Sequence, residues 1–543
     1  MIDIGVGIPE PHNEQVRYYG PGTSERAALQ SAISECAATP VDVPIHIDDR
    51  EIRTPLQFAI PSPHRHDLQL GTVHVADASH VEQAIASARK AAPAWAALDY
   101  TERARIFLKV ADLISGPMRD ILNAATMLGQ SKSVHQAEID AACESADFLR
   151  FNAAFGSAIM KEQPLAVPGL WNAVDYRPLE GFVLAVSPFN FTCVGLNLVA
   201  APALMGNVVV WKPSEKAALA AEYVYRAFRA AGVPPGVINV VHGDAGELVG
   251  RALDEPDFAG LHFTGSTAVF RGLSSRIYGR IEHYRSFPRL VGETGGKDFI
   301  LAHPSADIDT LVVALVRGAF EYQGQKCASA SRAYIPSSLW GRVRDQLHDI
   351  VGCLKMGDVA DFATYVGAVI DEGSFRRQED AIARARCEGA KIVVGGNVDR
   401  RDGWFVAPTV LEVTDPHCDS MSRELFGPIL SVWVYDDKDW DDVLTLVDGT
   451  SPYALTGSVF AQDRPALSEA TKRLRNAAGN LYINDKPTGS VVGQQPFGGM
   501  RGSGTNDKTG SPLNLLRWVS PRAIKENFAP ASDWRYPHLS SAL

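Results

Sequence analysis

The sequence lacks the features of several large protein classes. Its 543 residues carry a formal net charge of −11, so no excess of basic side chains is available to bind nucleic acid or an anionic membrane. The most apolar run, residues 196–211, contains two asparagines and a proline and falls short of a bilayer span. The N-terminus has neither a basic region nor an extended apolar core. It therefore does not resemble a secretory signal, and we expect a cytosolic protein.

Cysteine is also scarce. The seven cysteines are widely scattered, and no two of them form a C-x-x-C pair that would indicate a zinc site or a redox motif. We predict no metal site. In a reducing compartment most free thiols are packing residues, so a catalytic role for any one cysteine needs support from its neighbours.

The remaining composition predicts a multidomain globular protein. Hydrophobic residues make up 46% and charged residues 21% of the chain, and its length predicts two or three domains. Between residues 80 and 155, apolar side chains recur at spacings of three and four, which predicts helices. The segment before residue 80 is rich in proline and histidine and predicts loops.

From residue 181 strands and helices alternate. Apolar runs predict strands at 182–186, 208–211, 237–241 and 260–263, and Ser214 and Gly232 delimit a helix at 215–231. A second alternation runs from 299 to about 460, and an edge strand is predicted at 522–525. This order favours two α/β domains with parallel sheets, which bind ligands at the carboxyl ends of their strands.

Three short segments carry residues suited to catalysis. Cys327 follows Lys326 and precedes small residues, which leave room for a substrate, and a positive charge nearby would favour the nucleophilic thiolate. Glu293 stands among glycines whose backbone could let it reach a cavity as a general base, although most glutamates are solvated. Asn190 follows the first predicted strand and could stabilise an oxyanion or simply satisfy a turn.

Together these segments resemble the aldehyde dehydrogenase superfamily. The matching motifs occur in the order SPFNF (187–191), WKPSE (211–215), FTGS (263–266), GETGGK (292–297), GQKC (324–327), ELFGP (424–428) and PFGG (496–499). The resemblance implies an α/β aldehyde dehydrogenase fold with three parts. These are a Rossmann-like NAD-binding domain (1–156 and 180–295), a catalytic domain (296–509) and a small oligomerisation segment (157–179 and 510–543).

The resemblance also implies a role for each catalytic residue. Cys327 adds to the aldehyde carbon, Asn190 and the Cys327 N–H stabilise the oxyanion, and Glu293 activates the water that hydrolyses the thioester. The cofactor is expected to be NAD although no G-x-G-x-x-G follows a strand, and Glu215 would repel the 2′-phosphate of NADP. The implied cofactor-binding residues are Ser187, Lys212, Glu215, Gly265, Ser266, Glu424 and Phe426.

Residues 486–499 and 503–508 resemble the branch of this family that oxidises L-glutamate γ-semialdehyde to L-glutamate in proline degradation. In that branch Gly489 and Ser490 match the segment that binds the substrate carboxylate, and Phe191 and Phe497 match the aromatic pair around its aliphatic part. Both phenylalanines could equally be core residues. Glu144 could lie near the substrate ammonium group. One departure is Ala328, where many members have a serine that assists carboxylate binding.

Other functions remain open at this stage. The nearest is NAD-dependent oxidation of another acid-bearing aldehyde, such as succinate semialdehyde, which lacks the ammonium group. A CoA-acylating relative typically lacks the general base, so the presence of Glu293 argues against that function. Cys327, Glu293 and Asn190 are all intact, so the sequence does not support a catalytically silent structural or binding relative. The length leaves no room for a proline dehydrogenase domain. The family resemblance predicts a homodimer or higher oligomer, assembled through a strand near Asp175 and the C-terminal segment.

Overall fold

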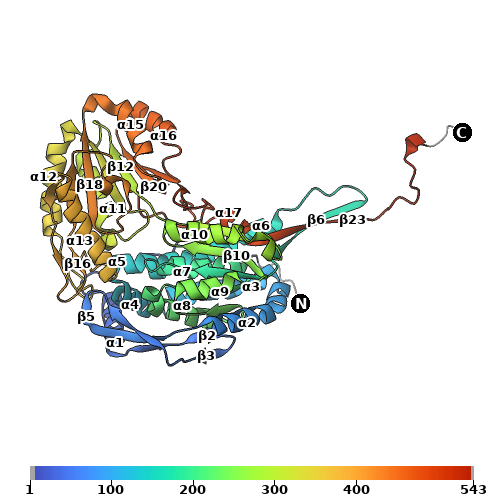
Figure 1. The fold of residues 1–543 in the computed structure, drawn as a ribbon. Helices are drawn as coiled ribbons and strands as arrows, with labels where there is room; N and C mark the ends of the chain where they lie inside the picture. The colour runs from blue at the N-terminus through green and yellow to red at the C-terminus, as the bar shows by residue number, and fades with distance from the viewer. Residues whose placement is uncertain (1–6, 540–543) are drawn as a thin grey trace.

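Two seven-stranded sheets form the framework of the computed structural model, which describes residues 7–539 (Figure 1). In the first sheet the order is β11-β10-β7-β8-β9-β2-β3. Its strands are β11 (Arg289–Glu293), β10 (Phe258–Thr264), β7 (Phe182–Val186), β8 (Val208–Lys212), β9 (Ile238–Val240), β2 (Ile45–Ile47) and β3 (Arg50–Ile52). The five strands from β11 to β9 are parallel, whereas β2 and β3 are antiparallel to their neighbours. The strand order reverses between β7 and β10, where a doubly wound sheet opens a crevice for its ligand.

The central strands of this sheet are apolar on both faces because helices cover both. On one face Phe182 and Leu184 of β7 pack with α2 (Ala78–Ala97) and α9 (Ala245–Leu253). On the other face Val183 and Ala185 pack with α3 (Tyr100–Ser115), α7 (Thr192–Leu204) and α8 (Ala218–Ala231). Continuous apolar runs are typical of such doubly covered parallel strands, so the predicted strands in this region are confirmed.

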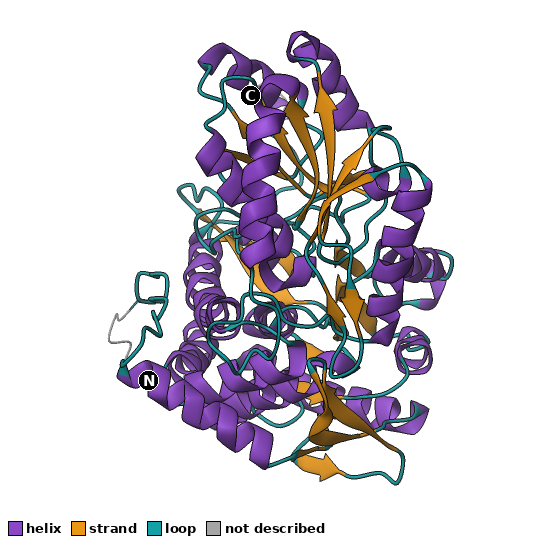
Figure 2. Ribbon diagram, turned by 90° about the vertical axis from the view of Figure 1, so that its left-hand side faces the viewer, coloured by secondary structure: helices purple, strands orange, loops and turns teal. Residues whose placement is uncertain are grey.

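The second sheet has the order β14-β17-β18-β13-β12-β20-β21. Its strands are β14 (Lys391–Val394), β17 (Thr409–Val413), β18 (Ile429–Tyr435), β13 (Ala330–Pro336), β12 (Asp298–Ala302), β20 (Thr456–Phe460) and β21 (Asn480–Ile483). Only β14 runs antiparallel within it. Figure 2 shows helices on both sides of this upper sheet. They are α11 (Ile308–Phe320) and α12 (Ser337–Cys353) on one side, and α13 (Glu372–Cys387), α15 (Trp440–Gly449) and α16 (Arg464–Arg473) on the other.

The prediction of loops before residue 80 is wrong. Helix α1 (Ser24–Ala38) is followed by a three-stranded sheet of β1 (Val41–Val43), β5 (Arg65–His74) and β4 (Gln57–Ser62). Thr23 caps α1 by accepting from the Arg26 N–H, and Leu70 and Val73 of β5 reach the core. Pro61 lies where the register of β4 on β5 shifts, a place where the missing N–H of proline costs little.

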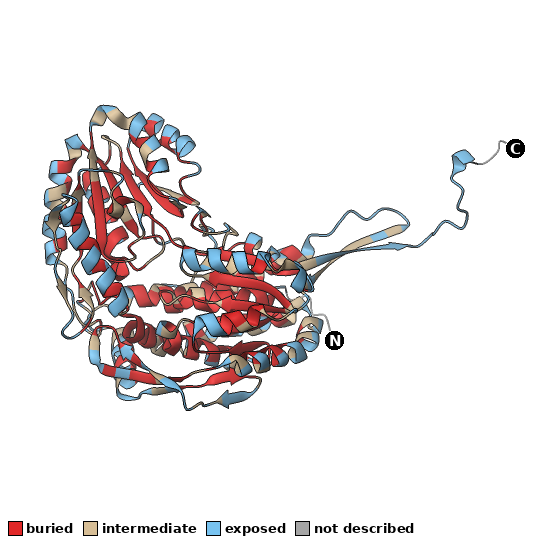
Figure 3. Ribbon diagram, viewed as in Figure 1, coloured by how far each residue is buried: buried red, intermediate tan, exposed pale blue. Residues whose placement is uncertain are grey.

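An antiparallel arm projects from the body. It pairs β6 (Leu170–Pro178) with β23 (Val519–Asn527), and most of the paired residues are exposed or only partly buried (Figure 3). The edge strand predicted at 522–525 is therefore confirmed and extended. The two sheets fall within the ranges predicted for the NAD-binding and catalytic domains, although α6 (Ser145–Lys161) crosses the boundary placed at 156. Within residues 7–539 no helix is long and apolar enough to span a bilayer.

The remaining elements connect these parts. They are α4 (Arg119–Gln130), α5 (Val134–Ala137), the π-helical η1 (Glu138–Glu144), η2 (Glu215–Ala217), α10 (Thr267–Tyr278), η3 (Ile281–His283), η4 (Glu321–Gly324), β15 (Val398–Asp399), β16 (Phe405–Val406), α14 (Asp419–Ser422), η5 (Asp437–Asp439), β19 (Tyr453–Ala454), β22 (Met500–Arg501), α17 (Pro512–Leu516) and η6 (Pro537–Leu539).

Candidate active site

A large cavity lies between the two sheets. Its volume is about 1190 Å³, and it is lined from the first sheet by residues at or just beyond the carboxyl ends of β7, β8, β10 and β11. From the second sheet it is lined by residues that directly precede β13 and β18. Loops at these strand ends therefore bring Asn190, Glu293 and Cys327 to one cavity, although they are far apart in the sequence.

Cys327 is presented by a left-handed turn. Tyr322, Gln323 and Gly324 have φ angles of 50°, 54° and 66°, a conformation that non-glycine residues adopt only when their surroundings hold them there. The Gln323 side-chain amide does so by donating to the backbone oxygens of Ser131, at 2.9 Å, and Ala368, at 2.8 Å. The chain thus reverses just before the half-buried Cys327.

The charge around Cys327 differs from the sequence-based hypothesis. The Lys326 ammonium group pairs with Glu321 at 2.9 Å, and Lys486 pairs with the same carboxylate oxygen at 3.2 Å. Burial, and then the Glu293 carboxylate, raise the pKa of the Cys327 thiol well above its usual range. The nucleophile is therefore a protonated thiol at neutral pH and needs a base to take its proton.

Glu293 ends β11 and has the properties of such a base. Burial raises its pKa to about 7, whereas a hydrogen bond from the Thr509 hydroxyl and the charge of Lys508 act in the opposite direction. The Thr509 Oγ1 to Glu293 Oε1 distance is 2.6 Å. Lys508 is itself fixed, because its ammonium group donates to the Gly479 and Gly498 carbonyls at 2.8 and 3.0 Å. A carboxyl group poised near neutrality suits general acid–base catalysis.

Asn190 is buried beside the nucleophile loop. Its side-chain amide donates one hydrogen bond to the Gln325 carbonyl at 3.0 Å, which leaves its second hydrogen for another acceptor. Helix α7 begins two residues later, and Asp140 accepts from the first N–H groups of that helix, those of Thr192 and Cys193, at 3.0 and 2.9 Å. Asp140 therefore fixes the start of the helix that follows Asn190.

Six of the seven residues predicted to bind the cofactor line the cavity: Ser187, Lys212, Gly265, Ser266, Glu424 and Phe426. The exception is Glu215, which begins η2 just beyond the cavity-lining Ser214. Ser266 caps the 12-residue helix α10, whose N-terminus faces the cavity. Free N–H groups and the helix dipole make such a terminus a suitable site for a pyrophosphate.

Glu424 and Phe426 line the cavity from the loop that precedes β18. Glu424 accepts from the Gly296 N–H at 3.0 Å, and burial raises its pKa to about 7. The Phe426 ring packs edge-on against Phe189 with 5.8 Å between the ring centroids. A cavity of this size, with a helix N-terminus at one part and carboxylates nearer the thiol, fits a dinucleotide together with a small substrate.

All five residues predicted to bind the substrate also line the cavity: Gly489, Ser490, Phe191, Phe497 and Glu144. Gly489 has a φ of 88°, which favours glycine at this position. Glu144 ends η1 and accepts a hydrogen bond from the Cys193 thiol at 3.1 Å. Burial, and then the charge of Asp140, raise the pKa of Glu144 to about 7. Ala328 is buried in the same wall.

Sequence reasoning missed Lys132 and Asp140. Lys132 is buried, its ammonium group lies 2.6 Å from the Asp140 carboxylate, and it stands over the rings of Phe191 at 4.1 Å and Tyr322 at 4.4 Å. Asp140, Glu144 and Cys193 bring their ligand atoms within 4.8 Å of one another. The signal in the sequence was the acidic residues among alanines at 138–144, but the cation that partners them could not be assigned without the fold.

Comparison with known proteins agrees with this geometry. The sequence model of the aldehyde dehydrogenase family matches residues 53–523. A Delta-1-pyrroline-5-carboxylate dehydrogenase of Dictyostelium discoideum is 48% identical, over 98% of this chain and 96% of the relative. The Homo sapiens protein of that name is 47% identical, over 97% and 94%. The NAD-bound crystal structure of Delta-pyrroline-5-carboxylate dehydrogenase from Mycobacterium tuberculosis has a TM-score of 0.96 and 51% identity, covering 99% of this chain and 100% of that one.

These names correct one expectation. The Dictyostelium discoideum, Bos taurus and Homo sapiens relatives are all named as mitochondrial, which points away from the cytosolic location expected from the sequence. That expectation is wrong, since the properties of the first few residues were too weak a guide to the compartment. Fold, cavity and motif order agree with the similarity over nearly the whole length, and this chain belongs to the aldehyde dehydrogenase family.

Proposed function

We propose that this protein catalyses the NAD-dependent oxidation of L-glutamate γ-semialdehyde, the hydrolysed form of Δ1-pyrroline-5-carboxylate, to L-glutamate in proline degradation. One observation carries the proposal. A single cavity joins a thiol, a carboxyl base and an amide donor to a glycine–serine loop suited to a carboxylate and a glutamate suited to an ammonium group. The relatives of nearly equal length are named for the same reaction.

The catalytic residues act in sequence. Cys327 gives its proton to Glu293, which releases it to solvent before the second half of the reaction. The thiolate adds to the aldehyde carbon, and the oxyanion accepts hydrogen bonds from the Asn190 amide and the Cys327 N–H. NAD, when bound, supplies the acceptor for the hydride that leaves this carbon. Glu293 then removes a proton from a water molecule, which attacks the Cys327 thioester and releases the acid and the free thiol. Aldehyde, NAD⁺ and water thus give acid, NADH and a proton.

The cofactor residues divide between the two ends of NAD. The N-terminus of α10, with Gly265 and Ser266, would hold the pyrophosphate. Lys212 and Glu215 would bind the adenosine ribose, where the carboxylate disfavours a 2′-phosphate, although Glu215 would have to turn toward the cavity. Ser187, whose N–H donates to the Lys212 carbonyl, lies beside these two residues. The contacts to the nicotinamide half would come from Glu424 and Phe426.

Substrate binding would use hydrogen-bond donors for the carboxylate of the substrate and a carboxylate for its ammonium group. Gly489 and Ser490 offer N–H and hydroxyl donors to the carboxylate, and Glu144 offers a carboxylate to the ammonium group. Phe191 and Phe497 would enclose the aliphatic part. Ala328 offers no hydroxyl, so Ser490 would have to provide the hydroxyl contact alone.

The arm is the proposed oligomerisation segment. Its two strands expose Trp171 and Ile524, and Phe528 just beyond β23 is 64% exposed. Such side chains on a projecting ribbon are suited to packing against a second copy of the chain. Light scattering on a chain that ends after Ser520 should show a smaller assembly than the full chain; an unchanged mass would contradict the role of the arm. The three-part division of the chain predicted from the sequence is proposed on the same basis.

The decisive experiment is NADH formation from Δ1-pyrroline-5-carboxylate at neutral pH. We expect turnover by the wild type and by Cys353→Ala, which removes an exposed thiol, and none by Cys327→Ala. Turnover that persists in Cys327→Ala would refute the mechanism. A higher kcat/KM for succinate semialdehyde than for glutamate semialdehyde would assign a different substrate.

A further inference from the structure

The N-terminal strap, residues 8–22, runs without regular secondary structure across α4, η1 and α6 before α1 begins. It precedes the region matched by the family model, which starts at residue 53. Arg17, Tyr18 and Tyr19 of the strap nevertheless line the catalytic cavity. The strap is therefore part of the wall of the site.

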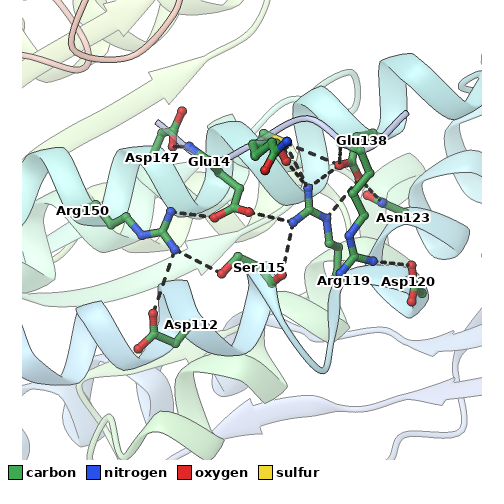
Figure 4. Close-up of polar contacts among 12 residues, drawn as sticks. Glu14, Asp112, Ser115, Arg119, Asp120, Asn123, Glu138, Asp147 and Arg150 are labelled. Carbon is green, nitrogen blue, oxygen red and sulfur yellow. Dashed lines mark hydrogen bonds and ion pairs between the residues drawn. The ribbon is translucent and has the colours of Figure 1, made fainter. Parts of the chain in front are cut away.

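The strap is held at fixed points on the helices. Figure 4 shows the Glu14 carboxylate between two guanidinium groups: Arg119 Nη1 lies 2.8 Å from one oxygen and Arg150 Nη1 lies 2.7 Å from the other. Burial alone would raise the pKa of Glu14, but these two cations outweigh it and hold the pKa below its ordinary value. Further along, Tyr19 donates its hydroxyl to Glu138 at 2.8 Å.

Asn13 connects the strap to the other side of the cavity. Its side-chain nitrogen donates to the Val492 carbonyl at 2.9 Å and to the Asp147 carboxylate at 2.8 Å. Its side-chain oxygen accepts from the Gln494 amide at 2.9 Å. Two of these three contacts are made to the loop at 489–495, here called the anchor loop, which contains Gly489 and Ser490.

Hydrogen bonds within the anchor loop fix its residues relative to one another. The Val491 carbonyl accepts from the N–H groups of Gln494 and Gln495 at 2.9 and 3.0 Å, and the Gln495 side chain accepts from the Val491 N–H at 2.9 Å. Gly493 has a φ of 84°, and a side chain there would meet the Phe151 ring. Val492 is itself buried against Phe148. A contact at Val492 therefore fixes Ser490, two residues away.

We propose that Asn13 is a positioning residue that holds the anchor loop in place, so that the N-terminal strap determines specificity for aldehydes that carry a carboxylate. The proposal rests on the proposed function, in which Gly489 and Ser490 receive that carboxylate. Asn13 acts through the anchor loop and not on the reacting atoms. Its loss should therefore affect the charged substrate more than an uncharged one.

The test compares KM and kcat for glutamate semialdehyde and for pentanal, which has the same chain length but neither charged group. In Asn13→Ala we expect KM for glutamate semialdehyde to rise about three- to tenfold, as for the loss of one or two hydrogen bonds, with a smaller rise for pentanal. Gln494→Ala removes only the hydrogen bond between Gln494 and Asn13. It should therefore raise the ratio of KM for glutamate semialdehyde to KM for pentanal less than Asn13→Ala does. Asn397→Ala, an exposed asparagine that does not line the cavity, is the matched control.

A second variant separates positioning from stability. Glu14→Gln weakens the ionic hold on the strap but keeps Asn13, so it should lower the temperature of thermal unfolding and change the KM ratio less than Asn13→Ala does. Equal rises of KM for both aldehydes in Asn13→Ala, or no rise, would overturn the positioning role and leave the proposed function intact. A wild type that oxidises pentanal but not glutamate semialdehyde would instead overturn the proposed function.

Discussion

The Thr509 hydroxyl sets the pH at which the general base works. Its 2.6 Å hydrogen bond to Glu293 favours the ionised carboxylate, against burial, which raises the pKa to about 7. Thr509→Val keeps the side-chain shape and removes this donor. A hydrogen bond to a charged group contributes about 1.5 to 3 kcal/mol, and about 1.4 kcal/mol corresponds to one pKa unit. At the lower end of that range, the midpoint for ionisation of Glu293 moves upward by about one pH unit.

The active form of the base is the carboxylate, so a higher pKa means less activity at neutral pH. With the midpoint moved up by about one pH unit, the ionised fraction at pH 7 falls about fivefold, and activity should recover as the pH is raised. The assay is kcat against pH together with a rapid-mixing measurement of the first turnover, which separates NADH formation from thioester hydrolysis. Thr471→Val, on the exposed side of α16, is the control. An unchanged or lower midpoint in Thr509→Val would refute the reasoning.

Three further changes test other parts of the structure. Ser490→Ala should raise KM for glutamate semialdehyde more than for an uncharged aldehyde of similar length, and equal changes would contradict a role in carboxylate binding. The pKa of Glu144 is about 7, so its carboxylate becomes charged as the pH rises from 6 to 8. KM for glutamate semialdehyde should therefore fall over this range. Glu144→Gln should abolish the pH dependence of KM, and an unchanged dependence would show that another group causes it. Glu138→Ala removes one of the two carboxylate partners of the buried Arg119, and with it the acceptor of the Tyr19 hydroxyl; it should destabilise the protein by about 3 to 5 kcal/mol in chemical denaturation, since buried charged and polar groups lose their partner. A loss below about 1 kcal/mol would mean that Glu14 alone compensates the charge of Arg119.

Much of the fold could be predicted from local patterns. Strands such as β7 and β18 are short apolar runs that stay apolar because both of their faces are covered, and this leaves a direct trace in the sequence. The region before residue 80 was misjudged because its strands lie among prolines and histidines, and even the ten-residue β5 begins with the polar residues Arg65, His66 and Asp67. Their stability comes from pairing, as between β4 and β5, and not from local propensity.

The sequence by itself determined the residue types of the site, because the motifs around Cys327, Glu293 and Asn190 stand in the order typical of one family. The tertiary structure decided how those groups are tuned. Lys326 turns to Glu321 instead of the thiol, Thr509 reaches Glu293 across 216 positions, and Asn13 reaches Val492 across 479. A motif is a local pattern, whereas a pKa or a fixed loop depends on which groups share a desolvated space. Only the folded chain brings such distant residues together, because burial strengthens their charges and hydrogen bonds once water is excluded.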